Sequence, residues 1–182
     1  TTAIGLNALS TNTTGANNLA VGVNSLLVCT TGAQNIALGP SAMVALTTGT
    51  YNVAVSQALA GTTTGVSNVG IGWGALHYGS TCDRNTAVGR SAGQNITTGD
   101  NNTFVGYESG MPGSPGGNIT TGSNEVCIGD ENVTEAHIQV DWTKASDKRD
   151  KTEITPLIMG LDFINKLEPV TYRWDKRSKY SE

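Results

Sequence analysis

Residues 13–26 read TTGANNLAVGVNSL, and most of this phrase returns with a period of 17 along much of the chain. It contains a Thr-Thr-Gly turn, an asparagine, three strand residues and a closing glycine. A period of this length is typical of a solenoid, in which each repeat forms one coil that buries its apolar face only against its neighbours. The closing position is occupied by Gly5, Gly22, Gly39, Ser56, Gly72, Gly89, Gly106 and Gly129.

The spacing of these closing positions is nearly constant. Counted along the sequence, the steps are 17, 17, 17, 16, 17 and 17, followed by one of 23 before Gly129. The extra residues fall in a Pro/Gly-rich stretch around 111–116, which predicts a loop that bulges from the stack. We therefore predict an all-β fold, a parallel β-solenoid or β-roll of about seven to eight coils over residues 1–135.

The predicted strand of each coil is a triplet such as Leu19–Val21 or Ile36–Leu38. Its third residue is always Val, Ile or Leu, and its middle residue is nearly always small. Because side chains alternate along a strand, the two sets point in opposite directions. We expect the branched set to fill the interior of the coil and the small set to face a closely approaching subunit or strand.

Two further features recur in every coil. An asparagine precedes most triplets and predicts a structural ladder of stacked amides rather than a ligand site. The glycine of the Thr-Thr-Gly turn is expected to adopt a positive φ. A second half-phrase, such as Ala75-Leu76, predicts the opposite wall of the coil. It thins to Ala92-Gly93, where the coil is expected to narrow or to change its packing partner.

Composition supports a solenoid and excludes several classes of function. With 23 Gly and only 5% aromatic residues, the chain cannot build a core around large rings. The sequence has no apolar run long enough to span a membrane, and no signal peptide is expected. Neither His77 nor His137 has a second His or a Cys nearby, so no metal and no cofactor are expected. The three cysteines occupy different phases of the repeat, which predicts free, buried thiols and assembly in a reducing cytoplasm.

Charge divides the chain near residue 140. Residues 1–140 carry two basic and seven acidic side chains, whereas residues 141–182 carry nine basic and eight acidic ones. The repeats lack a basic stripe, so nucleic-acid binding is not expected. We predict a repeat domain over 1–135, a linker strand over 136–145 and a second domain that begins at 146.

The second domain is expected to be a small α+β segment. Thr155 followed by Pro156 is typical of a helix start. Threonine caps the first turn of a helix, and the first helical position accepts a proline. Leu161 and Ile164 then lie on one face at helical spacing, and Pro169 ends the helix. A strand is predicted over 170–174.

These C-terminal residues resemble a known family. SDKRDK at 146–151 and GLDFINKLEPVTYRW at 160–174 are similar to the opening of the intramolecular chaperone domain of the peptidase S74 type. That domain occurs at the C-termini of phage tail fibres, tailspikes and endosialidases. The resemblance covers about residues 140–182. The repeats resemble those of phage fibres and of trimeric autotransporter adhesin heads, which fold as parallel β-rolls with three chains around an axis.

The resemblance implies a domain that drives trimerisation and then cuts itself off. It makes Ser146 the nucleophile, Lys151 the base and Ala145–Ser146 the bond that is cleaved. A lysine serves as a base only when burial or a like charge lowers its pKa from about 10.4 toward neutrality. The alternatives are that both residues lie in a solvated linker, or that the tail stays uncut as a permanent trimer clamp.

We therefore expect a homotrimeric structural and host-recognition component of a phage tail fibre, made in the host cytoplasm and carried on the virion. Its expected partners are a host cell-surface glycan or protein and other tail proteins. Receptor contact is expected at the loop 111–118 and at Trp73, His77 and Tyr78, because exposed rings often anchor such partners. The alternative for these rings is packing against neighbouring coils.

Three other functions remain open from the sequence, and the third of them is a structural solenoid that only binds. The first is the head of a bacterial trimeric adhesin, which shares the style of repeat. The second is a polysaccharide-degrading tailspike, which needs paired carboxylates in a groove. The acidic residues of the repeats are expected to fall at unrelated phases, which disfavours such a pair.

Overall fold

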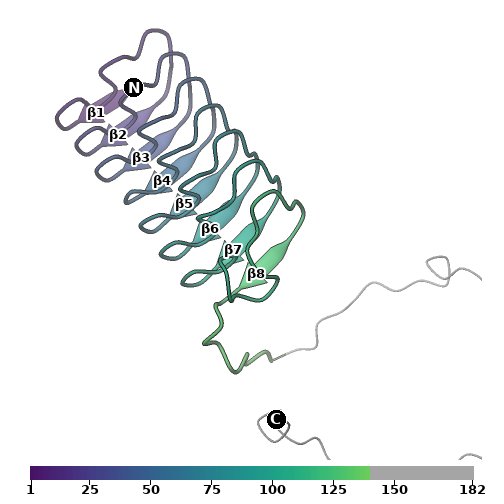
Figure 1. The fold of residues 1–182 in the computed structure, drawn as a ribbon. Helices are drawn as coiled ribbons and strands as arrows, with labels where there is room; N and C mark the ends of the chain where they lie inside the picture. The colour runs from purple at the N-terminus through teal and green to yellow at the C-terminus, as the bar shows by residue number, and fades with distance from the viewer. Residues whose placement is uncertain (140–182) are drawn as a thin grey trace, which may run out of the picture. The chain divides into compact units, whose positions relative to one another are not determined.

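The computed structural model describes residues 1–139, and its contacts divide the chain after His137, so the fold described here is that of the first unit. Eight short parallel strands form one sheet whose spatial order is the order of the chain (Figure 1). The strands are β1 (Thr2–Ile4), β2 (Leu19–Val21), β3 (Ile36–Leu38), β4 (Val53–Val55), β5 (Val69–Ile71), β6 (Thr86–Val88), β7 (Thr103–Val105) and β8 (Val126–Ile128). The predicted all-β parallel solenoid is confirmed, and residues 1–139 contain no helix.

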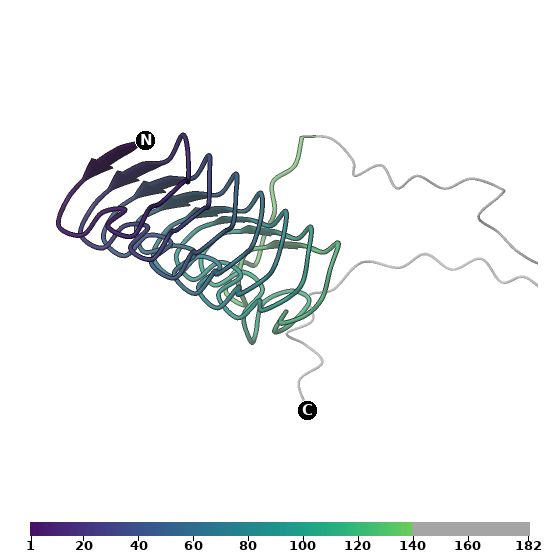
Figure 2. The ribbon, with the colours of Figure 1, turned by 90° about the horizontal axis from the view of Figure 1, so that it is seen from above.

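Successive strands pair at equivalent positions of the repeat, as when Ala20 of β2 lies opposite Ala37 of β3. Counted along the sequence, the strand starts advance by 17 in most coils, by 16 once, and by 23 from β7 to β8. The regular coils therefore number about six, fewer than the sequence led us to expect. In the view turned by 90°, each strand leads into a loop that passes beneath the sheet and returns to the start of the next strand (Figure 2). The predicted helix and strand after residue 150 lie outside the described residues. Of the linker strand expected over 136–145, only residues 136–139 are described, and they carry no strand.

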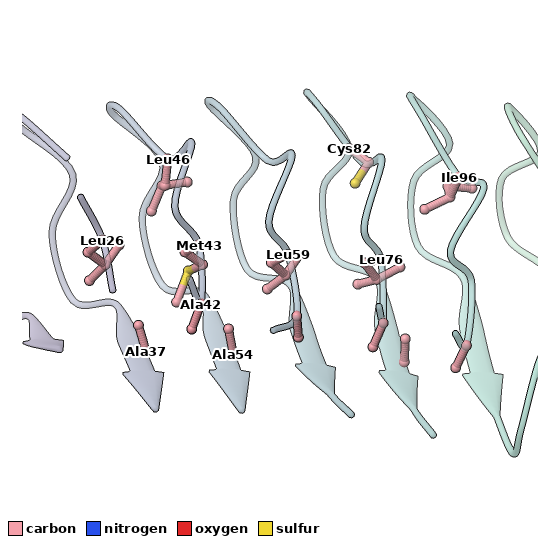
Figure 3. Close-up of a cluster of buried hydrophobic side chains, with 14 of the residues drawn as sticks. Leu26, Ala37, Ala42, Met43, Leu46, Ala54, Leu59, Leu76, Cys82 and Ile96 are labelled. Atoms are coloured by element: carbon pink, nitrogen blue, oxygen red, sulfur yellow. The ribbon is translucent and has the colours of Figure 1, made fainter. Parts of the chain in front are cut away.

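The strand faces are the reverse of those expected from the sequence. The small middle residues, such as Ala37 and Ala54, are fully buried, whereas the branched third residues lie outside, with Val88 39% and Ile128 51% exposed. Opposite the strands, a large buried side chain recurs at one position of successive coils, with further buried residues such as Leu46 beside it. Figure 3 shows these side chains at the same place in successive coils, and they are Leu26, Met43, Leu59 and Leu76. Only a small strand residue fits against them.

Phe104 of β7 explains why the second half-phrase thins. Its ring is fully buried in the interior, at the place where other strands carry alanine. Gly93 and Gly110 stand where other coils carry leucine, and a Cβ atom at either glycine would lie 2.5 Å from the Phe104 ring. The coil therefore does not narrow. It changes its packing partner, because one large side chain on the strand replaces one on the opposite wall.

The predicted asparagine ladder is confirmed and runs through the buried interior. The Asn52 side chain is typical: its Nδ2 donates to the Gly65 carbonyl at 2.7 Å. Its Oδ1 accepts the backbone N–H of Asn68 at 2.9 Å. At the last rung Glu125 takes the asparagine position, and its N–H donates to Asn102 Oδ1 at 2.9 Å. Each amide therefore satisfies backbone groups that the tight turns leave without partners.

The Thr-Thr-Gly glycine is required for space and not for a positive φ, which corrects the prediction. A Cβ atom on Gly32 would lie 2.6 Å from the Gly49 carbonyl oxygen of the next coil. The positive φ falls two residues later, at 59° for Gln34 and 60° for Tyr51. The closing glycines also need their freedom, since Gly22 has a φ of 135°.

The Pro/Gly loop does more than bulge from the stack. Pro115 accepts a hydrogen bond from Cys127 Sγ at 2.9 Å through its carbonyl, and the Gly110 N–H donates to the same sulfur at 3.1 Å. Ser114 is buried beside them. The loop therefore packs against the interior side chain of β8, and Cys127 is only 2% exposed.

All three cysteines are free and buried, as predicted. Burial raises the pKa of the Cys82 thiol from 9.0 to about 11. Its thiolate is therefore disfavoured in the folded chain relative to the unfolded chain. This thiol contributes stability that is fully present below about pH 9 and is lost as the pH rises through about 11.

We expect Cys82→Ala to remove this part of the alkaline loss of stability. Urea unfolding of both proteins between neutral pH and the alkaline range measures the difference, because every other titrating group is common to the two chains. The free energy of unfolding of the unmodified chain should fall more steeply above pH 9. Parallel curves would show that the Cys82 thiol does not titrate differently on folding.

Candidate functional site

The sheet presents a continuous apolar surface, which we call the outward face. It consists of the first and third residues of each strand. The first-position column is Thr2, Leu19, Ile36, Val53, Val69, Thr86, Thr103 and Val126, and the third-position column is Ile4, Val21, Leu38, Val55, Ile71, Val88, Val105 and Ile128. None of these side chains is charged, and only the threonines are polar.

The outward face is open to solvent in a single chain. Ile71 is 39% and Val105 is 40% exposed, and Val126 at the end of the stack is 67% exposed. At a strand spacing of about 4.8 Å the face extends for about 35 Å. An ordered strip of aliphatic side chains of this length is typical of an interaction surface rather than of scattered surface residues.

A third line of side chains, which we call the border column, lies next to the outward face. Each member stands two residues beyond the third position of its strand: Leu6, Val23, Pro40, Gln57, Trp73, Arg90, Tyr107 and Asp130. The guanidinium carbon of Arg90 lies 5.5 Å from the Trp73 ring centroid and 5.6 Å from that of Tyr107. The cation is therefore stacked between two rings from the coils on either side.

The sequence analysis singled out Trp73 and missed Arg90 and Tyr107. The three residues are one repeat apart and become neighbours only because the coils stack in register. The signal was present, since all three occupy the same phase of the repeat. Within residues 1–139, Arg84 pairs with Asp100 at 3.7 Å, whereas no carboxylate lies within ion-pair distance of Arg90.

The three rings expected to form one receptor site are divided into two groups. Trp73 contacts Arg90, whereas His77 and Tyr78 stack edge to face with ring centroids 4.7 Å apart. Tyr78 is 53% exposed and His77 is half-buried. In the loop 111–118, Pro112 and its neighbour Gly113 are exposed.

Two carboxylates prove to be neighbours, contrary to the expectation that acidic residues fall at unrelated phases. Asp83 and Asp100 occupy the same turn in adjacent coils, but both are engaged by the backbone. Asp100 Oδ1 accepts the Asp83 N–H, and Asp83 Oδ1 accepts the Val66 N–H, each at 2.8 Å. Asp100 also pairs with Arg84. These contacts are those of turn-stabilising groups and not of a general acid and base across a groove.

The remaining candidates are a metal site, a membrane span and the predicted catalytic pair. Residues 1–139 contain no group of three His, Cys, Asp or Glu side chains placed to hold a metal ion. Nor does that part of the chain include a helix of the length and apolarity needed to cross a membrane. The proposed catalytic pair, Ser146 and Lys151, and the Ala145–Ser146 bond lie outside the described residues.

The described residues thus define a parallel β-solenoid protein with one apolar flank. Comparison with known proteins adds an assignment for the C-terminal segment. Residues 146–182 match the model of the peptidase S74 family, described as the chaperone of endosialidase. The match begins at Ser146, the first residue of the motif that carries the resemblance. No curated protein and no solved structure matches the chain.

Proposed function

We propose that this chain is part of a homotrimeric tail fibre or tailspike-type protein of a bacteriophage, in which the solenoid forms a structural and host-binding segment. The match of residues 146–182 to the endosialidase chaperone family supports the class of protein. The parallel solenoid supports a shaft built from repeated coils. On this proposal the chain is made in the host cytoplasm and acts on the virion, next to other tail proteins.

The observation that carries the assembly is the outward face. A single chain leaves two columns of mostly aliphatic side chains in water, and covering them contributes roughly 25 cal/mol per Å² of apolar area. Three copies, each turning this face toward a common axis, would bury all of these columns together. Within the described residues, charged side chains are absent from the face itself, so its desolvation requires no charge burial.

A charge on this face is the direct test. We expect Val55→Lys to convert the trimer to monomer at micromolar concentration, because the ammonium group would be buried among aliphatic side chains without a partner. Sedimentation velocity and native mass measurement report the change. Thr48→Lys is the matched control, since Thr48 is exposed and lies on the Thr-Thr-Gly turn. A monomeric unmodified chain, or a V55K variant that remains trimeric, would contradict the assembly.

Self-cleavage is the second element of the proposal. The Ser146 hydroxyl attacks the Ala145 carbonyl carbon as Lys151 accepts its proton. The Ala145–Ser146 C–N bond then breaks, the proton passes to the leaving Ser146 amine, and water hydrolyses the resulting ester to the Ala145 carboxylate and the Ser146 hydroxyl. We expect a denaturing gel to show the unmodified chain split at this bond and Ser146→Ala intact. Cleavage that persists in Ser146→Ala would remove Ser146 from the mechanism, and an intact unmodified chain would favour the permanent clamp.

Host contact is proposed at the surfaces that the assembly leaves free. His77 and Tyr78 lie outside both columns of the outward face, as does the loop 111–118. Trp73 belongs to the border column next to that face. We therefore assign contact with a host glycan or protein first to His77, Tyr78 and the loop, and only secondarily to Trp73.

A further inference from the structure

Identical stacked solenoids face a problem of register. The third-position column of the outward face is aliphatic at every coil, so sliding one copy past another by one strand spacing of about 4.8 Å replaces aliphatic side chains there with aliphatic side chains. Such a surface can bind another copy strongly, but it does not determine which coils of the two copies lie side by side. Flat, uniform strands have the same weakness in their pairing register. The residues that fix the register between two copies must therefore lie where one coil differs from the next in residue type.

The two margins of the face are both polar in two neighbouring coils. The first-position column is aliphatic from β2 to β5 and becomes polar at Thr86 and Thr103. The border column, on the other margin, carries Arg90 and Tyr107 in those same two coils. At these two coils the polar residues of one margin stand level with those of the other, whereas Gln57 and Asp130 of the border column stand level with Val53 and Val126.

Resting on the proposed trimer, we propose that the border column of each copy lies against the first-position column of the next copy at the same level, and that Arg90 fixes this register. The two margins are four residues apart along the chain, at most about 13 Å for a fully extended segment. Around a three-fold axis, the border column of each of the three copies contacts the first-position column of the next copy. These head-to-tail contacts close into a ring.

Arg90 is suited to this role by its surroundings. The guanidinium carbon lies over both the Trp73 and the Tyr107 rings, and the group has no carboxylate within ion-pair distance among residues 1–139. In the aligned assembly these donors meet the hydroxyl of the partner subunit's Thr86. The stack holds the cation at a fixed level, because each ring belongs to an adjacent coil.

Slippage would remove this match. A shift of one coil in one direction places Arg90 against the partner subunit's Val69, which offers no hydrogen-bond acceptor on its side chain. In a closed ring of three, a shift at one junction must be reversed at another. A slipped ring therefore always contains one junction with Arg90 against valine, which leaves a desolvated cation without a partner.

Paired cysteines on the two margins test the register. Leu19→Cys with Val23→Cys places one thiol on each margin of the same coil, and we expect interchain disulfides that close covalent trimers under oxidation. A disulfide closed within one chain would run at monomer mass on a non-reducing denaturing gel, which distinguishes it from the interchain links. Ile36→Cys with Val23→Cys is the matched pair, which links only copies that have slipped by one coil. The natural cysteines are free and buried, and the unmodified chain controls for them.

The outcomes separate the register from the assembly. We expect linked trimers for the 19/23 pair and none for the 36/23 pair, with the 36/23 product appearing once Arg90→Leu is added. A chain that is trimeric by sedimentation but links both pairs equally, or neither, would overturn the register. A 36/23 pair that stays unlinked in Arg90→Leu would overturn the role of Arg90. A monomeric mass for the unmodified chain would overturn both this inference and the proposed assembly.

Discussion

Replacing Phe104 with alanine is expected to lower the free energy of unfolding by about 4 kcal/mol. The ring is the largest fully buried side chain of the solenoid, and it faces Gly93 and Gly110, which contribute no side chain of their own. The truncation therefore leaves a cavity that the neighbouring coils cannot fill. Urea unfolding, followed by circular dichroism, measures the loss.

A second substitution should repair this damage. Other coils place a leucine opposite a strand alanine, as Leu76 does, with a φ of 51° that closely resembles the 57° of Gly93. We expect Gly93→Leu combined with Phe104→Ala to recover most of the lost stability, whereas Gly93→Leu alone destabilises the chain by colliding with the ring. A double variant no more stable than Phe104→Ala would show that the two positions do not exchange volume.

Asn52→Leu is expected to cost about 3 kcal/mol or more, because several buried groups lose their partners at once. The Asn52 amide bonds to the Gly65 carbonyl, to the Asn35 side chain and to the backbone N–H of Asn68. Leucine has a similar volume but can satisfy none of these groups. The measurement is the urea midpoint at constant slope.

The same chemical change at an exposed position provides the control. Asn95 donates to the Asn118 side chain at 2.8 Å in a solvent-exposed contact. We expect Asn95→Leu to change the free energy of unfolding by less than about 1 kcal/mol, since water replaces the lost partner. Equal losses in the two variants would mean that the interior ladder contributes no more than surface hydrogen bonds.

The sequence was sufficient to predict the coil and its internal ladder. Both follow from constant spacing, because residues one repeat apart must stack once the chain is a solenoid, and a polar residue such as Asn52 at constant phase then forms a column. The strand positions followed in the same way. The loop around 116 was located by its composition, but its packing against Cys127 was not, because that contact depends on the end of the stack.

The faces of the strands could not be predicted from alternation alone. Alternation separates Val88 from Ala87 but does not say which one points inward, and branched residues are usually the buried ones. Here the opposite wall approaches so closely that only a methyl group fits, so Ala87 is buried and Val88 is exposed. The Arg90 stack was missed for a related reason, since its partners are distant in sequence. Ser146 and Lys151 remain predictions from the resemblance.

The interior amides have a consequence for the length of the protein. Each asparagine bonds only to groups in its own coil and in the two adjacent coils, so deleting or adding a complete repeat leaves every remaining rung with the same partners. The length of the solenoid can therefore change in steps of about 4.8 Å, one coil at a time, while the sequences of the other coils stay the same. Evolution could lengthen such a shaft by simple duplication of DNA, and an engineer could shorten it in the same way.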